Sequence, residues 1–324
     1  MPHAIRIKEF GGPEVLEWVE TQLPEPGPGE VRIAHTAVGV NFIDCYFRSG
    51  LYPVELPSGL GSEAAGTVVA IGPGVTNVAP GDRVAYANPP PAQSYSEECV
   101  MNAKWLVRIP NGIAEETAAA MMLKGLTSWY LLRRTYRVQA GDWILLYAAA
   151  GGVGLIATQW ASHLGARVIG VVSTEQKREI ALENGCEEVL LADSEIAAQV
   201  RELTGGEGTP VVYDSVGRDT LFTSLDCLRT RGLLVSFGNA SGPVDSLPLL
   251  ELAKRGSLYV TRPTLWDHVR RPEDLREACD ELFRLVGAGD LKIEIGQRFP
   301  LSAAADAHRA LEGRRTTGST VLVP

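Results

Sequence analysis

The sequence predicts an α/β protein in which a doubly wound parallel sheet is accompanied by a second, β-rich domain. The N-terminal third consists of short alternating runs separated by Pro and Gly, which is typical of strands. From Asp142 onward, strand-like apolar runs alternate with helix-like runs, and this order indicates a parallel sheet with helices on both faces. The 324 residues are enough for two domains, at about 150 residues each.

Strands are expected first, followed by a long helix. The Pro- and Gly-rich segments 24–29 and 89–91 mark loops between the strands. Residues 115–132 are rich in Ala, Met and Leu, so we expect a helix that links the two domains, with Gly125 as an interruption or a join. The expected strands of this part are residues 4–7, 31–37 and 66–71.

The doubly wound domain is expected to follow this helix. Its expected strands are residues 143–148, 167–172, 189–191, 211–214, 233–237 and 258–260, and its expected helices are residues 155–164 and 176–184. An apolar stripe predicts another helix at 274–286, and 320–323 is expected to be a strand. We therefore divide the chain into 1–123, the β-rich part, 124–262, the doubly wound domain, and 263–324, a C-terminal segment.

Charge and cysteine content exclude several classes of protein. The chain has 30 Lys and Arg against 39 Asp and Glu, and the resulting net charge of -9 disfavours binding to nucleic acid. The five cysteines are odd in number and widely spaced, so they form neither a disulfide framework nor a CxxC zinc pattern. The start MPHAIRIKEF lacks the apolar segment of a secretory signal, and we expect a cytoplasmic protein.

Residues 143–162 are uncharged and long enough to cross a membrane, but the run AAAGGVG would break such a helix, so we expect a buried strand, a turn and a helix instead.

The glycine-rich turn within this stretch is the strongest local signal. Ala149, Gly151 and Gly154 occupy the three positions of the GxGxxG dinucleotide fingerprint. Gly151 lets the backbone approach a pyrophosphate, and Gly154 allows close packing of helix on sheet. The N–H groups at the helix start would bind the anion.

The end of the next strand favours NADPH over NADH. Domains that bind NAD usually carry an acidic residue there, whereas this chain has Ser173 and Thr174. The cations Lys177 and Arg178 follow, and hydroxyls with cations suit a 2′-phosphate. Alternatively, the two cations belong only to a solvated helix face, and Glu175 argues against a phosphate site.

Motifs of other catalytic chemistries are absent from the sequence. It contains no GxxxxGK[ST] loop, no HExxH, no GxSxG and no Tyr-x-x-x-Lys pair. The five histidines are isolated from one another, which is more typical of surface or core residues than of metal ligands.

Several segments together resemble one known family. They are GGPEVL at 11–16, VGVNFIDCYFRSGLYP at 38–53, PSGLGSEAAG at 57–66, LKGLTSWYLL at 123–132, AAAGGVG at 148–154, VVYDSVGRDT at 211–220 and SLYVTRPTL at 257–265. The chain resembles the zinc-independent quinone oxidoreductases of the medium-chain dehydrogenase/reductase superfamily, which include zeta-crystallin and the bacterial NADPH:quinone reductases. The resemblance implies a GroES-like β-rich catalytic domain, completed by the returning segment 263–324, and a Rossmann domain that binds NADPH.

The resemblance also implies that no metal is bound. Zinc-dependent relatives hold the catalytic metal with an early Cys and with the His of a GHE segment. Asn41 stands in the region of that Cys, and Ser62 precedes Glu63 where the His would stand. Two of the three protein ligands that a catalytic zinc needs are therefore missing.

The implied reaction is the transfer of reducing equivalents from C4 of the nicotinamide to a small quinone. A quinone is already a strong hydride acceptor, so it needs no Lewis acid. By resemblance, Asn41, Tyr46 and Tyr52 line the catalytic site, where an amide and two phenols would bind an oxygen that gains negative charge. The alternative for the tyrosines is packing at a domain edge.

Other positions are implied to bind the cofactor. They are Phe42, Ile43 and Asp44 beside the nicotinamide, Tyr130, the turn residues Gly151, Gly152, Val153 and Gly154, the 2′-phosphate residues Ser173, Thr174 and Lys177, and the ribose residues Phe237, Gly238, Asn239, Arg262 and Arg314. Bacterial relatives often have an Asn-Tyr pair after the third strand, where this chain has Leu191 and Ala192. The preference for NADPH would then depend mainly on Lys177, and partial use of NADH is expected.

Two other functions remain open at this stage. Related zinc-free reductases saturate the C=C bond of 2-alkenals or enones, and the same site could serve them. Zeta-crystallin relatives also act as lens structural proteins or RNA binders, although no Lys- and Arg-rich patch with aromatic residues supports RNA binding here. The resemblance further implies a homodimer formed through the sheet edge near residues 258–260. The acidic charge balance and the broken uncharged stretch argue against nucleic acid and membrane as partners.

Overall fold

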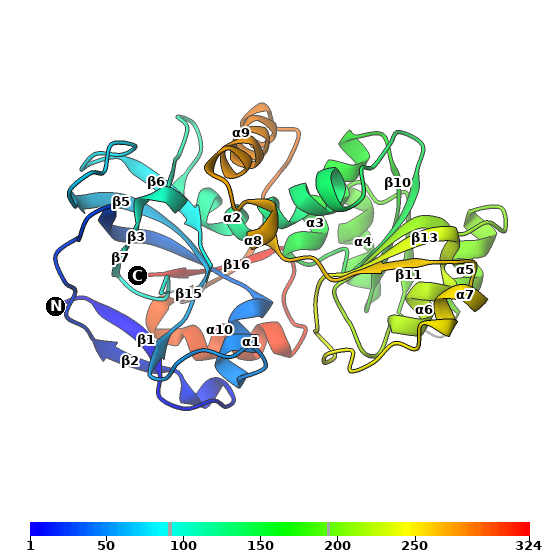
Figure 1. The fold of residues 1–324 in the computed structure, drawn as a ribbon, viewed down its shortest axis with the longest axis horizontal. Coiled ribbons are helices and arrows are strands. Elements are labelled where there is room, and N and C mark those ends of the chain that lie inside the picture. The colour runs from blue at the N-terminus through cyan, green and yellow to red at the C-terminus, as the bar shows by residue number, and fades with distance from the viewer. Residues whose placement is uncertain (90–92, 193–194) are drawn as a thin grey trace. The chain divides into compact units, whose positions relative to one another are not determined.

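The computed structural model describes residues 1–89, 93–192 and 195–324, which form two compact units (Figure 1). The first unit consists of Met1–Leu126, Arg271–Gly287 and Ile293–Pro324, and the second consists of Thr127–Arg270 and Ala288–Lys292. The first unit is built on mainly antiparallel sheets and the second on a parallel sheet with helices. The predicted α/β fold class with a doubly wound sheet and a β-rich partner is therefore confirmed.

The second unit contains the parallel sheet, whose strand order is β11-β10-β9-β12-β13-β14. The strands are β9 (Trp143–Tyr147), β10 (Arg167–Val172), β11 (Glu188–Leu191), β12 (Thr209–Asp214), β13 (Leu228–Ser236) and β14 (Tyr259–Thr261). The chain runs outward from β9 to β11, crosses back to β12 beside β9, and then runs outward to β14. This reversal creates the switch point at which doubly wound sheets bind ligands, at the carboxyl ends of the strands.

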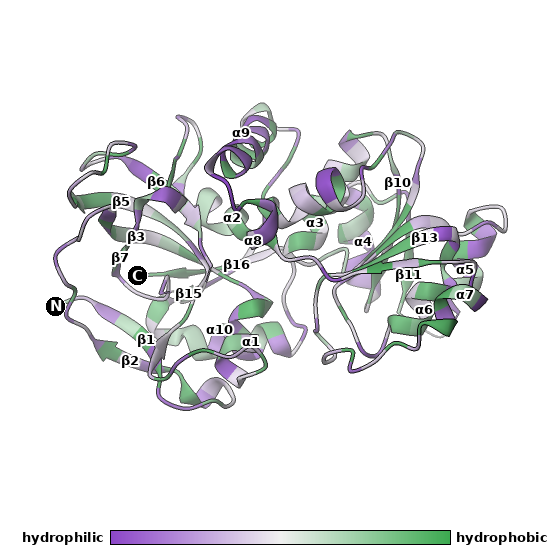
Figure 2. Ribbon diagram, in the orientation of Figure 1, coloured by the Kyte–Doolittle hydropathy of each residue, from purple (hydrophilic) through white to green (hydrophobic). Residues whose placement is uncertain are grey.

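Helices cover both faces of this sheet. The helices α3 (Gly152–His163) and α4 (Glu175–Glu183) lie on one side, and α5 (Ile196–Leu203), α6 (Leu221–Asp226) and α7 (Leu250–Lys254) lie on the other, while α8 (Leu265–His268) follows β14 (Figure 1). The strands are nearly continuous apolar runs because both faces are covered, and they appear as hydrophobic segments in Figure 2. Leu145, Ile169, Val212 and Leu234 are completely buried in this core.

The first unit carries two sheets, of order β2-β1-β4 and β15-β16-β3-β5-β6-β8, with β7 paired to β3. The strands are β1 (His3–Ile7), β2 (Glu17–Glu20), β3 (Glu30–Val40), β4 (Ser58–Gly59), β5 (Glu63–Ile71), β6 (Arg83–Ala87), β7 (Glu98–Asn102), β8 (Val107–Arg108), β15 (Ile295–Pro300) and β16 (Ser319–Val323). Its helices are α1 (Phe42–Ser49), α9 (Pro272–Ala288) and α10 (Ala304–Glu312), with short 3-10 turns at Pro13–Val15, Ala103–Trp105 and Leu301–Ala303. Pairing of β16 with β3 joins the C-terminal segment to the N-terminal sheet.

The linking helix corrects one expectation. The helix α2 (Glu115–Tyr130) continues through Gly125 and ends in a π-helical turn at Leu131–Thr135. A Cβ atom on Gly125 would lie 2.5 Å from Cδ2 of Leu282 on α9. Gly125 therefore does not interrupt the helix as we expected, and its small size instead allows α9 to pack against α2.

Two further expectations concern the uncharged stretch and a loop. Among the described residues, no helix is long and apolar enough to cross a membrane, and residues 143–162 instead form β9, the turn and most of α3. Of the loop expected at 89–91, Pro90 and Pro91 lie outside the described residues.

Candidate active site

The glycine-rich turn joins β9 to α3 at the carboxyl edge of the parallel sheet. Gly151 is the N-cap of α3 and has an extended backbone, and no side chain caps the helix. Helix geometry leaves the N–H groups of Gly152, Val153 and Gly154 without intrahelical acceptors. These donors, together with the positive end of the helix dipole, suit a pyrophosphate, and Gly151 places no side chain in front of them.

Two residues of this turn explain its close packing. A Cβ atom on Gly154 would overlap the carbonyl oxygen of Ala148, so only glycine lets α3 begin this close to β9. The left-handed residue of the turn is Ala148, with φ of 55°. Ala149, which occupies the first fingerprint position, is completely buried. The left-handed backbone position is therefore Ala148, one residue before the first position of the fingerprint.

The residues expected at the 2′-phosphate surround the start of α4. Ser173 and Thr174 are exposed after β10, and Thr174 caps α4 by accepting a hydrogen bond from the Lys177 N–H over 3.3 Å. Glu175 lies 3.6 Å from the guanidinium of Arg178. The nearby carboxylate thus has a cationic partner other than Lys177, which lessens its conflict with a phosphate at this position.

The loops after β12 and β13 are bound to one another at the same sheet edge. Asp214 is buried, and its carboxylate accepts hydrogen bonds from the N–H groups of Val216 and Gly217 and from the hydroxyls of Thr220 and Ser224, over 2.7 to 3.1 Å. A Cβ atom on Gly238 would overlap the carbonyl oxygen of the first of these loops, at Ser215. The segment Phe237–Asn239 is thereby held close to that loop, beside the switch point.

Two other expected cofactor residues have defined contacts in the second unit. Arg262 donates a hydrogen bond from Nη1 to the carbonyl oxygen of Ser236, over 2.7 Å, which places it at the end of β13. Tyr130 is buried and stacks on the ring of His268, with centroids 4.7 Å apart and an interplanar angle of 7°. Arg314 lies in the first unit and is exposed.

In the first unit, Asn41 begins helix α1 and lies beside a buried carboxylate. Asp44 is completely buried, and accepts hydrogen bonds from the Asn41 N–H (2.9 Å), the Ser62 hydroxyl (3.0 Å) and the Tyr95 hydroxyl (3.1 Å). Burial raises the pKa of Asp44 to about 7, although the three donors act in the opposite direction. The carboxylate of Asp44 therefore holds α1 in place, and its position beside the nicotinamide stays a prediction.

The expected catalytic tyrosines lie together, Tyr46 within α1 and Tyr52 just after it. The rings of Tyr46 and Tyr52 meet edge to face with centroids 5.2 Å apart, and Tyr46 also contacts Phe42 at 5.8 Å. Tyr46 is buried and Tyr52 is half-buried. The expected neighbour Ile43 is half-buried on the first turn of the same helix. The two tyrosine rings thus contribute to packing around α1, and the binding of a substrate oxygen by their hydroxyls stays a prediction.

The positions that hold zinc in the metal-dependent relatives form a different cluster here. Asn41 Nδ2 donates to Glu63 Oε1 over 2.8 Å, and Lys124 Nζ lies 2.5 Å from the same oxygen. An ammonium group has no lone pair to offer a metal, and an asparagine amide is not among the side chains that hold zinc. Within the described parts of the chain, no three His, Cys, Asp or Glu side chains form a group that could hold a metal ion. The donor set therefore does not fit a catalytic zinc.

Sequence reasoning missed several residues that this site depends on. Lys124, Tyr95, His308 and Asp214 were not among the candidates, and Glu63 was considered only as a neighbour of the missing zinc ligand. One signal was present, because Lys124 is a lone cation within the apolar segment LKGLTSWYLL. The partners of the others are distant in sequence, so no local pattern could identify them.

Comparison with known proteins covers the whole chain. Residues 27–121 match the alcohol dehydrogenase GroES-like domain, and residues 152–284 match the zinc-binding dehydrogenase family. The chain is 56% identical to a quinone oxidoreductase of Pseudomonas aeruginosa, with 100% of both chains covered. It is 45% identical to a 2-haloacrylate reductase of a Burkholderia species, covering 100% of this chain and 99% of that protein. The crystal structure of the Escherichia coli quinone oxidoreductase complexed with NADPH is 48% identical and superimposes with a TM-score of 0.97, covering 99% of this chain and 100% of that chain.

Proposed function

This chain belongs to the quinone oxidoreductases of the medium-chain dehydrogenase/reductase superfamily, and we propose that it reduces small quinones with NADPH and without a metal. The observation that carries this proposal is the full-length likeness to quinone oxidoreductases, at 56% identity in one case. The carboxyl edge of the parallel sheet supports it, since the uncapped start of α3 fits a pyrophosphate. The first unit is the catalytic domain and the second is the cofactor domain. The division into 1–123, 124–262 and 263–324 stays a prediction, since the units themselves change after Leu126 and after Arg270.

NADPH supplies the hydride, and the protein supplies binding, orientation and exclusion of water. The start of α3, from Gly151 to Gly154, binds the pyrophosphate. Ser173, Thr174 and Lys177 bind the 2′-phosphate. Phe42, Ile43, Asp44 and Tyr130 line the nicotinamide half of the site. The ribose is held by Phe237, Gly238, Asn239, Arg262 and Arg314.

The quinone is bound by groups of the first unit. The Asn41 amide and the hydroxyls of Tyr46 and Tyr52 orient the quinone and stabilise its oxygen as negative charge develops there. Because a quinone is already a strong hydride acceptor, this hydrogen bonding replaces the metal that an unactivated carbonyl would require.

The test is the loss of NADPH absorbance with the chelator-treated enzyme and a small quinone, repeated with NADH. Fast turnover with NADPH that is insensitive to the chelator is the expected result. No turnover despite tight binding of NADPH would contradict the proposal and would favour a structural role instead.

A second candidate function is reduction of a C=C bond conjugated to a carbonyl. The 45% identity to a 2-haloacrylate reductase favours it, because that protein is also similar over its whole length. A 2-alkenal and a 2-haloacrylate, offered in parallel with the quinone, separate the two functions by product analysis. A higher kcat/KM for either of them than for the quinone would assign C=C reduction as the main activity.

We further propose that the protein is a cytoplasmic homodimer formed through β14. This strand is the edge of the parallel sheet, and Tyr259 on it is 60% exposed. Leu249, Leu250 and Phe222 are also exposed, at 79%, 63% and 47%, so a second copy has apolar surface to cover. An exposed edge strand favours pairing with another strand. Sedimentation of the wild type and of a Tyr259→Lys variant tests this, and equal monomeric masses for both would contradict it.

A further inference from the structure

Glu63 is the centre of a buried charged cluster in the first unit. Its carboxylate is completely enclosed and accepts hydrogen bonds from Asn41 Nδ2 (2.8 Å) and from the backbone N–H of Leu123 (2.6 Å). Lys124 is 4% exposed, and its ammonium lies 2.5 Å from Glu63 Oε1. Charges this deep persist only when they are paired and hydrogen-bonded, and this cluster meets both conditions.

The neighbouring backbone is shaped to admit this carboxylate. Gly39 on β3 pairs with Glu63 on β5. A Cβ atom on Gly39 would overlap Glu63 Oε1 and would lie 2.5 Å from the carbonyl oxygen of Ala119 on α2. A glycine at this position therefore lets β3, β5 and α2 approach each other around the charged pair.

The cluster determines how the Asn41 side chain is oriented. An ionised carboxylate only accepts hydrogen bonds, so the amide nitrogen of Asn41, and not its oxygen, must face Glu63. The ammonium of Lys124 lies directly against the same carboxylate oxygen, and like the amide nitrogen of Asn41 it needs an acceptor there.

We propose that Glu63 and Lys124 are positioning residues for the reaction. Lys124 pairs with the Glu63 carboxylate and holds it in place, and the carboxylate fixes which end of the Asn41 amide is presented to the bound quinone and nicotinamide. This inference rests on the role of Asn41 in the proposed function and adds the two residues that orient it.

The first test replaces the ammonium by an apolar group of similar length, in Lys124→Met. We expect kcat to fall by about tenfold, the effect of one misplaced hydrogen bond, and KM for NADPH to change little. Lys124→Arg keeps the charge and should retain most of the activity. Lys8→Met is the matched control, because Lys8 is 68% exposed and forms an ion pair with Glu17 of the same unit at 2.7 Å.

A double variant, Glu63→Gln with Lys124→Met, removes both charges and leaves no buried ion unpaired. The glutamine amide introduced in this variant can donate or accept, so Asn41 is again not fixed, and we expect kcat to stay low although no buried charge is left unpaired. This pair of variants separates loss of orientation from loss of stability. It also tests the proposal if the single variant fails to fold.

A second measurement does not depend on activity. In protein labelled with ¹⁵N-asparagine, the side-chain amide signal of Asn41, assigned with an Asn41→Ala variant, should move in both Lys124→Met and the double variant, and not in Lys8→Met. An unmoved signal together with wild-type kcat in Lys124→Met would overturn the proposal. If the wild type did not reduce quinones at all, the proposed function would fail, whereas the Asn41 signal would still decide the orientation.

Discussion

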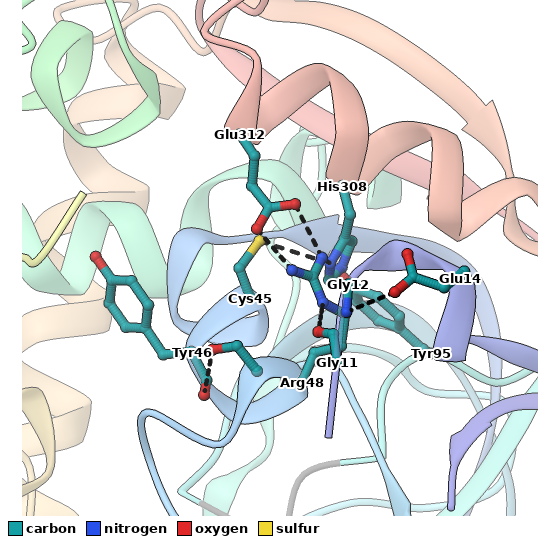
Figure 3. A network of polar contacts seen from close by, with 10 residues as sticks. Gly11, Gly12, Glu14, Cys45, Tyr46, Arg48, Tyr95, His308 and Glu312 are labelled. Atoms are coloured by element: carbon teal, nitrogen blue, oxygen red, sulfur yellow. Dashed lines mark hydrogen bonds and ion pairs between the residues drawn. The ribbon is translucent and has the colours of Figure 1, made fainter. Parts of the chain in front are cut away.

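Tyr95 donates a hydrogen bond to Asp44 Oδ2 over 3.1 Å, and both residues are buried. The Tyr95 hydroxyl also lies 3.0 Å from Nε2 of His308, and Nδ1 of that ring accepts from Arg48 Nη1 over 3.0 Å (Figure 3). Because a guanidinium only donates, Nε2 must carry the hydrogen of this histidine. In this series of three hydrogen bonds, each donor therefore lies on the Arg48 side and each acceptor on the Asp44 side. The series connects the two ends of α1.

The first prediction concerns the pH dependence of stability that Asp44 causes. Burial raises the pKa of Asp44 from 3.8 to about 7, so between these values the folded protein binds a proton that the unfolded chain does not. The contribution of Asp44 to the free energy of unfolding therefore decreases as the pH rises from about 4 to 7, and it is constant above that window. Urea unfolding of the wild type and of Asp44→Asn at several pH values measures the difference.

Two histidines act in the opposite direction and must cancel in this comparison. Burial lowers the pKa of His308 to about 3 and that of His35 to about 4. Their contributions to stability are lost as the pH falls from about 6.5, because the unfolded chain then binds the proton more readily. Both proteins contain these residues, so the difference between them isolates Asp44. A difference that is the same at every pH would contradict the prediction.

The second prediction concerns Arg48, which is 2% exposed and binds several chain segments. Its guanidinium donates to the carbonyl oxygen of Gly11, to His308 and to both carboxylate oxygens of Glu312, the last two at 2.6 and 3.0 Å (Figure 3). Arg48→Met should lower the free energy of unfolding by about 2–4 kcal/mol, somewhat less than for a fully buried pair because Glu312 remains partly hydrated.

An exposed ion pair on α10, the helix that carries Glu312, provides the control for Arg48. Arg309 on α10 is 49% exposed and lies 2.7 Å from Asp306. Its replacement by Met should change stability by no more than about 0.5 kcal/mol. Equal losses in the two variants, measured by urea unfolding, would show that Arg48 has no special structural importance.

The third prediction separates two glycines of the cofactor turn. Gly154→Ala should destabilise the protein by about 1–3 kcal/mol, because the added Cβ overlaps the Ala148 carbonyl oxygen. A Cβ on Gly151 would lie 3.2 Å from that oxygen, so Gly151→Ala should keep nearly the wild-type melting temperature. It should nevertheless bind NADPH at least about tenfold more weakly, since the methyl group occupies the space of the pyrophosphate. Unchanged affinity in a stable Gly151→Ala protein would argue against this site.

The fourth prediction concerns the choice between NADPH and NADH. Lys177→Ala should weaken NADPH binding by about 10- to 100-fold, the effect of one charge-assisted hydrogen bond to the 2′-phosphate, and should leave NADH binding unchanged. Arg178→Ala is the control, because Arg178 is 44% exposed beside Glu175. Fluorescence titration with NADPH and with NADH measures the affinities of the wild type and of both variants. Equal weakening of NADPH and NADH by Lys177→Ala would remove this residue from the phosphate site.

The local patterns of this sequence determined the parallel sheet and its cofactor turn. Strand and helix periods, with a glycine-rich turn between β9 and α3, depend on residues close in the chain, and the structure forms these elements near the expected positions. The resemblance placed Asn41 near the catalytic centre, and the order of hydroxyls and cations after β10 favoured NADPH. The role of Gly125 was wrong, since a sequence shows a small residue but not the helix α9 that packs against it.

Only the tertiary structure decided which polar and charged residues meet. Asn41 and Glu63 are 22 positions apart, Glu63 and Lys124 are 61 apart, and Tyr95 and His308 are 213 apart. Each pairing requires strands and helices from distant parts of the chain to pack against each other. The periodic patterns of the local sequence do not reveal such pairings. Burial makes these pairings necessary, because a polar or charged group removed from water needs a partner inside the protein. The fold alone determines which partner is within reach.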